Sequence, residues 1–214
     1  MTASGDIPNY AQLPLGCFLD MVASREPAPG GGASAAVALA AALSGMAARL
    51  SADHLAETET LVGTAEELRG RVMPLARANA AAYGRVLDAY RIPRSDEKGR
   101  RRTVREALSE AADVPLSIAE IGAEVSGIAA RLAEEGNPNL RGDAVTAAAL
   151  AGAGVRAAIT LVEINASAGV PTTTGYPAGA SSSPRRPPRR SSSKPPEHGM
   201  RERGVRTSAW APAS

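Results

Sequence analysis

The sequence predicts an all-α protein, an up-and-down bundle of about five long helices followed by a disordered C-terminal tail. Ala, Leu, Arg and Glu dominate long segments in which apolar residues recur with a 3.6-residue spacing. Alternating β-branched runs bounded by turn signals are absent. The breaks between the segments, PAPGGG, RIPRSD and GNPNLRG, are short. Short connections between long helices favour antiparallel neighbours, and hence a bundle.

The helices follow from the apolar spacing and from these breaks. They are expected at about residues 10–23, 33–53, 57–91, 96–134 and 143–167. Pro74 and Pro115 fall inside the third and fourth of these segments. Because proline lacks a backbone N–H, each of the two is expected to kink or restart its helix.

The second and last predicted helices are apolar on nearly every side. In the last helix after residue 143, only Arg156 and Glu163 carry a charge. A helix of this kind is expected to be buried on most sides. The many small residues of these two helices imply that they approach their neighbours closely. Burying both helices also requires more contact surface than a single bundle of five helices can offer. We therefore expect a homodimer or a larger homo-oligomer.

Charge divides the chain into two parts. Residues 1–169, the predicted helical domain, carry a net charge of −4, whereas residues 170–214 carry +6, and the two add up to the +2 of the whole chain. The second part is rich in Pro, Ser and Arg and is expected to be a disordered tail. Aromatic residues are not interleaved with its arginines, so we consider a nucleic-acid partner unlikely.

Composition excludes several other classes of protein. Cys17 is the only cysteine, so an internal disulfide is excluded, and His54 and His198 lie too far apart to indicate a metal site. The first residues have neither the basic nor the apolar region of a signal peptide, and no membrane span is expected. A cytoplasmic protein fits this composition.

A glycine run precedes the second predicted helix, in the stretch Pro29, Gly30, Gly31, Gly32 and Ser34. Free backbone N–H groups and the positive end of a helix dipole suit a phosphate or carboxylate ligand. The run is neither a Walker loop, since no GK[ST] follows, nor a dinucleotide fingerprint, since no strand precedes it. The alternative is a tight turn between helices, and the residues alone do not decide between the two.

A second polar stretch, GNPNLRGDAVTAA, precedes the last predicted helix. Asp143 stands where an N-cap is expected. Asn137, Asn139 and Arg141 add amide and guanidinium groups, which is more polar chemistry than a cap requires. These residues favour a functional site, with capping as the alternative. Asn165, near the end of the last helix, is more typical of a C-terminal cap.

A third stretch, ANAAAYGRVLDAYRIPR, places Asn79 and Tyr83 four residues apart on one helix face. Core packing explains Tyr83 adequately. It explains Asn79 less well.

Three motifs in order resemble the formiminotetrahydrofolate cyclodeaminase / methenyltetrahydrofolate cyclohydrolase family. They are FLDMVASREPAPGGGASAAVALAAAL, AAAYGRVLDAYRIPR and GNPNLRGDAVTAAALAGAGVRAAITLVEIN, and the resemblance covers about residues 12–167. It implies an all-helical, dimer-forming domain that acts on one-carbon tetrahydrofolate, with no cofactor beyond that substrate and no metal. It further implies a folate site lined by the glycine stretch and contacted by Asn137 and Asn139, with Asp143 as the proton-transfer candidate.

The resemblance implies two reactions. One is hydrolysis of 5,10-methenyltetrahydrofolate to 10-formyltetrahydrofolate, and the other is cyclisation of 5-formiminotetrahydrofolate with loss of ammonia. The sequence favours the hydrolysis or both, since no formiminotransferase domain is attached. The resemblance also implies that Asn79 is a candidate catalytic position, where the family has an acidic residue. It implies that Tyr83 and Arg94 contact the substrate, with Arg94 in place of the family's lysine. The alternatives are therefore a catalytically impaired folate binder and a helical interaction protein.

Overall fold

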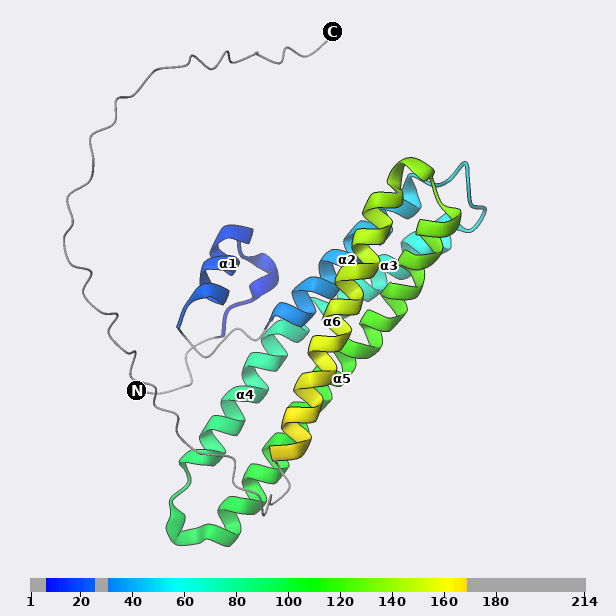
Figure 1. Ribbon diagram of the computed structural model, residues 1–214. Helices are drawn as coiled ribbons and strands as arrows, with labels where there is room; N and C mark the ends of the chain where they lie inside the picture. Colours follow the sequence, from blue (N-terminus) through cyan, green and yellow to red (C-terminus); the bar gives the residue numbers. More distant parts are fainter. Residues whose placement is uncertain (1–6, 26–30, 169–214) are drawn as a thin grey trace, which may run out of the picture. The chain divides into compact units, whose positions relative to one another are not determined.

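The computed structural model describes residues 7–25 and 31–168, and these ranges contain helices but no strand (Figure 1). The α-helices are α1 (Leu15–Ala23), α2 (Gly32–Arg49), α3 (Thr58–Val72), α4 (Leu75–Arg91), α5 (Glu97–Glu135) and α6 (Arg141–Ala168). Short 3₁₀ turns precede α1, α5 and α6, at Tyr10–Gln12, Arg94–Asp96 and Pro138–Leu140. The prediction of an all-α bundle is confirmed. The five predicted segments correspond to α1, which starts later than expected, α2, the pair α3 and α4, α5 and α6. The predictions for Pro29, Gly30 and the tail lie outside the described residues.

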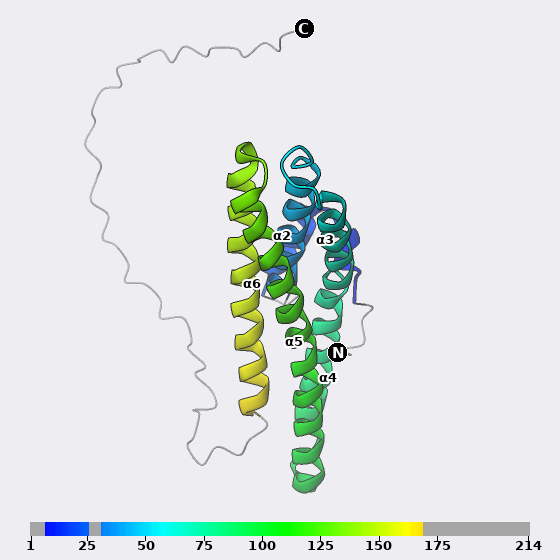
Figure 2. The same cartoon turned by 90° about the vertical axis from the view of Figure 1, so that its right-hand side faces the viewer.

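Helix α5 is the axis of the bundle, because it packs on α6, α4, α2 and α3. Figure 2 shows α3 and α4 following one another along α5, with α2 beside the half of α5 that carries α3 and with α6 along most of its length. Helices α2 and α6 run antiparallel. Ala33, at the start of α2, lies beside Gly154, whereas Ala47, near its end, clusters with Ala144. This arrangement determines where each predicted site residue lies.

The core between α2, α5 and α6 is built on small residues. A Cβ atom added at Gly154 would lie 2.6 Å from Cγ2 of Val37 and 3.1 Å from the carbonyl oxygen of Ala33. A Cβ atom at Gly122 would lie 2.8 Å from Cγ2 of Val155. Contacts this short require displacement of the neighbours, so both positions admit only glycine without rearrangement. The prediction of close approach between these helices is confirmed.

The prediction that α6 is buried on most sides is wrong for the single chain. One side of α6 is fully buried through Ala144, Ala147, Ala151 and Ala158, but Val145 is 52% and Ile164 56% exposed. The stretch Pro138–Ser167, with a mean hydropathy of 1.7, and α2, with 1.3, are long and apolar enough to cross a membrane by length and composition. Core helices of soluble proteins pass the same test. Only 22% of the first stretch is buried, so one side of α6 is both apolar and uncovered.

The two internal prolines behave differently. The helix is interrupted at Met73 and Pro74, and a new helix, α4, starts after the proline, as expected. Pro115 lies inside α5 without interrupting it, so the expectation of a restart there is wrong. A proline at position 115 leaves the carbonyl oxygen of Ala111, four residues earlier, without its helical donor. The side-chain amide of Asn165 on α6 donates to that oxygen at 2.9 Å, which explains how α5 tolerates the proline. Asn165 is therefore not the C-terminal cap that the sequence suggested.

We expect Asn165→Ala to lower the free energy of unfolding by about 1–3 kcal/mol, because the carbonyl of Ala111 would lose its donor inside the bundle. The same substitution in a Pro115→Ala background should cost much less, since an alanine N–H can satisfy that carbonyl within α5. Urea denaturation of the four chains of this cycle measures the coupling. Equal costs in the two backgrounds would contradict the account.

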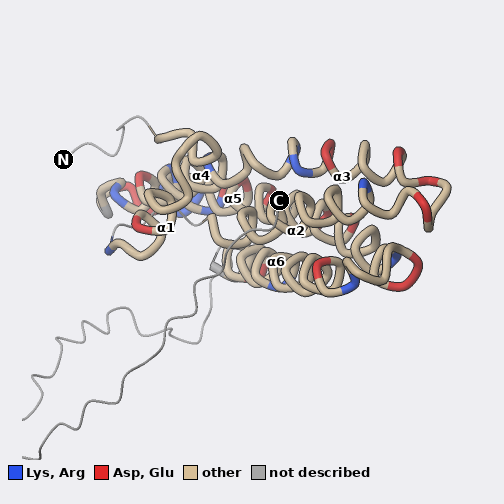
Figure 3. Tube along the Cα trace, turned by 90° about the horizontal axis from the view of Figure 1, so that it is seen from above, with Lys and Arg blue, Asp and Glu red and all other residues tan. Residues whose placement is uncertain are grey.

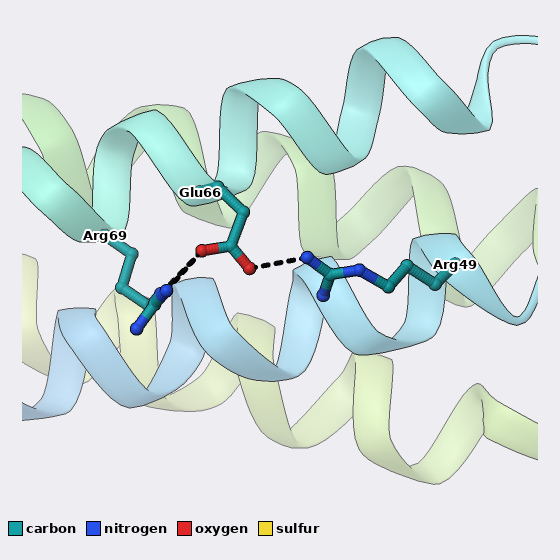
Figure 4. A network of polar contacts seen from close by, with 3 residues as sticks. All are labelled: Arg49, Glu66 and Arg69. Carbon is teal, nitrogen blue, oxygen red and sulfur yellow. Dashed lines mark hydrogen bonds and ion pairs between the residues drawn. The ribbon is translucent and has the colours of Figure 1, made fainter.

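Charged residues are concentrated on α3, α4 and α5, whereas α2 and α6 carry few (Figure 3). One network connects α2 to α3 (Figure 4): Nη2 of Arg49 lies 2.7 Å from Oε1 of Glu66, and Nε of Arg69 donates to Oε2 of Glu66 at 2.9 Å. Two hydrogen bonds, the more important from Arg49 and the other from Arg69, lower the pKa of Glu66 below its ordinary value of 4.5. The carboxylate therefore stays ionised in the folded chain at pH values where an unfolded chain would bind a proton.

Because the pKa of Glu66 is lowered by folding, its contribution to stability is present above pH 4.5 and is lost as the pH falls through the folded value. We expect the melting temperature of the parent chain to fall more steeply than that of Glu66→Gln over this acid range. Thermal unfolding followed by circular dichroism between pH 7 and pH 3 measures the difference. Parallel curves for the two chains would mean that Glu66 does not stabilise the contact between α2 and α3.

Candidate functional site

The described part of the glycine stretch, Gly31, Gly32 and Ser34, lies at the first turn of α2. Gly31 precedes the helix with φ −82°, a value open to any residue, so its backbone conformation does not require glycine. Its surroundings are tight, because a Cβ atom at Gly31 would lie 3.3 Å from Cβ of Ala76 and 3.5 Å from the ring of Phe18. The hydroxyl of Ser34 is buried and donates to the carbonyl oxygen of Gly31 at 3.0 Å. Ser34 therefore fixes the backbone of the stretch.

A cavity of about 230 Å³ lies against this first turn. Ser34 and Ala38 of α2 form one wall, and Met73 and Ala76 form another. The N-terminal segment contributes Tyr10, Ala11, Leu13, Leu15 and Phe18. The rings of Tyr10 and Phe18 meet edge to face with centroids 6.2 Å apart. An apolar cavity with aromatic walls suits a flat ring system.

The sequence reasoning named Ser34 but gave no role to Tyr10 and Phe18, which also line this cavity. Phe18 is the only phenylalanine of the chain, and it follows Tyr10 by eight residues in a sequence that is only 3% aromatic. This local concentration of rings just before the glycine stretch was the available signal. Burial raises the pKa of the Tyr10 hydroxyl, and the positive charge of Arg77 partly opposes this effect. Tyr10 therefore stays protonated and able to donate a hydrogen bond, with a cationic side chain nearby.

Helix α4 carries the second group of predicted residues away from the cavity. Asn79 is half-buried one turn beyond Ala76, and Tyr83 lies one turn further. Tyr83 is 44% exposed, so core packing does not explain it. Arg94 lies three residues beyond the end of α4. That end, Arg91, is 15 residues and thus about 22 Å along the helix from Ala76 in the cavity wall.

The third group lies at the turn between α5 and α6. Asn137 has structural partners there: its side-chain amide donates to the carbonyl oxygen of Leu50 at 2.9 Å, and its side-chain oxygen accepts from the N–H of Asn139. The backbone N–H of Asn137 also donates to the buried hydroxyl of Ser51 at 2.9 Å. Asn137 is the N-cap of the 3₁₀ turn that leads directly into α6.

Asp143 is the third residue of α6 and not its N-cap, because Asn137 caps the preceding turn and the helix begins at Arg141. A carboxylate in a first turn still interacts favourably with the positive end of the helix. The Asp143 side chain is half-buried, and Asn139 is exposed. Both side chains are therefore accessible at this end of the bundle.

Within one chain, the glycine stretch and the Asp143 turn are at opposite ends of α2. Gly31 precedes the helix, whereas Asn137 binds Leu50 at its end. The 18 residues of α2 span about 27 Å. One chain thus brings the glycine stretch together with Tyr10, Phe18 and the start of α4, but not with Asp143. Within residues 7–25 and 31–168, no group of three or more His, Cys, Asp or Glu side chains could hold a metal ion.

Comparison with known proteins assigns the family. The family model described as formiminotransferase-cyclodeaminase matches residues 14–169, which include the glycine stretch, α4 and the Asp143 turn. The chain belongs to the formiminotransferase-cyclodeaminase family. The family resemblance inferred from the three motifs is therefore confirmed.

Relatives within the formiminotransferase-cyclodeaminase family are similar along most of this chain. The methenyltetrahydrofolate cyclohydrolase of Methylorubrum extorquens is 36% identical over 160 residues, covering 70% of this chain and 77% of that protein. The rat formimidoyltransferase-cyclodeaminase is 32% identical over 173 residues, covering 76% of this chain but only 32% of the rat protein. This chain thus spans about a third of the length of the rat relative.

A solved structure within the family shares the fold. The formiminotetrahydrofolate cyclodeaminase of Thermotoga maritima superposes with a TM-score of 0.66 at 33% identity, over 74% of this chain and 80% of that one. The helical bundle is thus a fold of the formiminotransferase-cyclodeaminase family. Most residues that line the cavity at the start of α2 lie within the matched range, whereas Tyr10, Ala11 and Leu13 precede it.

Proposed function

We propose that this folate one-carbon enzyme hydrolyses 5,10-methenyltetrahydrofolate to 10-formyltetrahydrofolate. The observation that carries the proposal is the aromatic-walled cavity at the first turn of α2, where Phe18 and Ser34 belong to the residues matched to the family. The relative matched over most of its own length is named as a cyclohydrolase, which favours hydrolysis. Cyclisation of 5-formiminotetrahydrofolate with loss of ammonia is the second candidate reaction, supported by the name of the Thermotoga maritima protein.

The hydrolysis requires only that the protein position a water molecule next to the substrate and transfer protons. The methenyl carbon is already an electrophilic iminium, so water adds to it directly, and a ring C–N bond then breaks as the formyl group forms. One group must accept the proton of water and return one to the leaving nitrogen. We assign the flat ring system to the cavity beside Tyr10 and Phe18. Asp143 is the proton-transfer candidate, and Asn79 lies one turn from the cavity wall.

The remaining parts of the proposal concern the state of the protein. The tetrahydrofolate derivative is the only ligand, with no metal and no further cofactor. The chain acts as a homodimer in the cytoplasm. The uncovered apolar side of α6 supports the dimer, since an exposed apolar face of this length is typical of an interface between subunits.

Loss of methenyltetrahydrofolate absorbance in the presence of the purified chain tests the main reaction. Release of ammonia from 5-formiminotetrahydrofolate tests the second. We expect the first to be catalysed and folate to raise the melting temperature. Stabilisation without turnover of either substrate would identify a catalytically impaired folate binder. Neither stabilisation nor turnover would leave a helical interaction protein.

A further inference from the structure

We propose that Tyr10 selects the ligand of the cavity at the start of α2, because its hydroxyl donates a hydrogen bond to the ring system of the folate. The inference rests on the proposed function, which puts that ring system in the cavity. The match to the family begins at residue 14, and the three sequence motifs also lie after Tyr10. Neither of them therefore assigns a role to this residue.

Tyr10 has a fixed place in the cavity wall. It is only 8% exposed, and it clusters with Ala76 and Ala80 of α4. Its ring meets the ring of Phe18 edge to face. The side chain of Asn9 caps the 3₁₀ turn that starts at Tyr10 and so holds the backbone of this residue. The hydroxyl is therefore presented by a packed side chain and not by a mobile one.

The hydroxyl of Tyr10 forms no hydrogen bond with any group of residues 7–25 and 31–168. A buried tyrosine normally directs its hydroxyl to a hydrogen-bond partner. Within the same ranges, Nε of Arg100 is the only fully enclosed side-chain nitrogen or oxygen without a partner, so the oxygen of Tyr10 still borders open space. Because Tyr10 lines the cavity, a ligand there can supply the missing partner.

The other side chains of the cavity wall offer no competing donor. Of the residues that line the cavity, only Tyr10 and Ser34 carry a hydroxyl, and the others are apolar. The hydroxyl of Ser34 already donates to the carbonyl oxygen of Gly31 at 3.0 Å. Apolar walls accept any ring of suitable size, whereas a few placed polar groups fix its orientation and provide specificity. Among these side chains, that task falls to Tyr10.

The size of the cavity limits which part of the ligand Tyr10 can contact. Its volume of about 230 Å³ is smaller than the about 300–1,000 Å³ typical of sites that enclose a whole small molecule. The cavity therefore holds a flat ring system and not a complete folate. The ring system of a folate has a carbonyl oxygen and ring nitrogens, which can accept a hydrogen bond from a phenol. A hydrocarbon ring of the same size has no such acceptor.

The electrostatic surroundings suit Tyr10 to donation. Burial raises the pKa of its hydroxyl above the ordinary value of 10.0, and the positive charge of Arg77 partly opposes this effect. The oxygen therefore keeps its proton at neutral pH. Arg77 follows Ala76 of the cavity wall in sequence, and its nearby charge polarises the O–H bond, which strengthens a hydrogen bond to a ligand acceptor.

Tyr10→Phe tests the hydroxyl alone, because phenylalanine keeps the ring and its contact with Phe18. Calorimetric titration with tetrahydrofolate should show about 3- to 10-fold weaker binding, the loss expected for one hydrogen bond. KM for 5,10-methenyltetrahydrofolate should rise by a similar factor at unchanged kcat, since the substrate and the transition state lose the same contact. The melting temperature of the ligand-free variant should equal or exceed that of the parent, because no hydrogen bond within the chain is lost.

A second ligand and a second variant serve as matched controls. Naphthalene, a fused two-ring hydrocarbon without an acceptor, should bind to the parent chain and to Tyr10→Phe with equal affinity. Tyr90→Phe makes the same chemical change at a tyrosine that is 46% exposed on α4. Tyr90 is 14 residues, and thus about 21 Å along the helix, from Ala76. This variant should bind both ligands as the parent does.

Three results would overturn the role of Tyr10. The first is an unchanged affinity of Tyr10→Phe for tetrahydrofolate. The second is an equal loss of naphthalene binding, which would indicate an altered cavity shape. The third is a lower melting temperature of the ligand-free variant, which would show that the hydroxyl stabilises the fold. A parent chain that binds tetrahydrofolate through Tyr10 without turnover would remove the proposed hydrolysis but keep the assignment of Tyr10.

Discussion

Gly31→Val is expected to abolish folate binding and to leave the helix content largely intact. A Cβ atom at this position already lies 3.3 Å from Ala76 and 3.5 Å from Phe18. The two methyl groups of valine must therefore displace the N-terminal segment or enter the cavity. Both outcomes remove space for a ring system, whereas Ala76 and Phe18, the two neighbours that the new side chain meets, belong to a cluster separate from the core of α2, α5 and α6. Calorimetric titration with tetrahydrofolate measures the loss, and circular dichroism measures the helix content.

Gly63→Val is the matched control for this prediction. Gly63 lies on α3, and a Cβ atom there has no neighbour within 4 Å. The control changes the same residue types inside a helix without touching the cavity, so its affinity should equal that of the parent. Undiminished binding by Gly31→Val would place the folate elsewhere on the molecule.

Asp143→Asn is expected to lower turnover by ~10²-fold or more, because asparagine keeps the size and hydrogen bonding of the side chain but cannot exchange a proton. Stability should change by less than about 1 kcal/mol, since the only known loss is the favourable position of the charge in the first turn of α6. The expected signature is a lower kcat with little change in folate affinity.

The pH dependence of the residual activity separates proton transfer from binding. If Asp143 moves a proton, the variant should lose the limb of the kcat profile that reflects its ionisation. Turnover close to that of the parent would reduce Asp143 to a residue that stabilises the start of α6.

The sequence was sufficient to predict the fold and the class of enzyme. Apolar spacing predicted the all-α bundle, and three motifs predicted the family and its folate chemistry, all of which are confirmed. These features are local in sequence, so a single chain displays them. The positions of helix ends were less accurate. The last helix begins at Arg141 because Asn137 caps a preceding 3₁₀ turn, which the spacing of apolar residues does not reveal.

The features that the sequence did not predict depend on contacts between distant residues. The family resemblance implied that the glycine stretch and the Asp143 turn belong to one site, but the three motifs carry no information on which end of α2 each of them occupies. Tyr10 and Phe18 line the cavity only because the N-terminal segment folds against α2 and α4. The prediction of a buried α6 assumed that the apolar residues of this helix are covered by other helices of the same chain. The structure leaves Val145 and Ile164 exposed, and the roles of the site residues remain predictions.

The contact between Asn165 and the carbonyl of Ala111 makes Pro115 and Asn165 a dependent pair. If Asn165 is replaced first, the chain becomes less stable, because the carbonyl of Ala111 loses its donor. If Pro115 is replaced first, no such loss occurs. The permitted order of replacement is thus fixed by a single unsatisfied carbonyl. For engineering, Pro115→Ala is the change to make before any redesign of the end of α6, because it frees position 165 for an apolar residue.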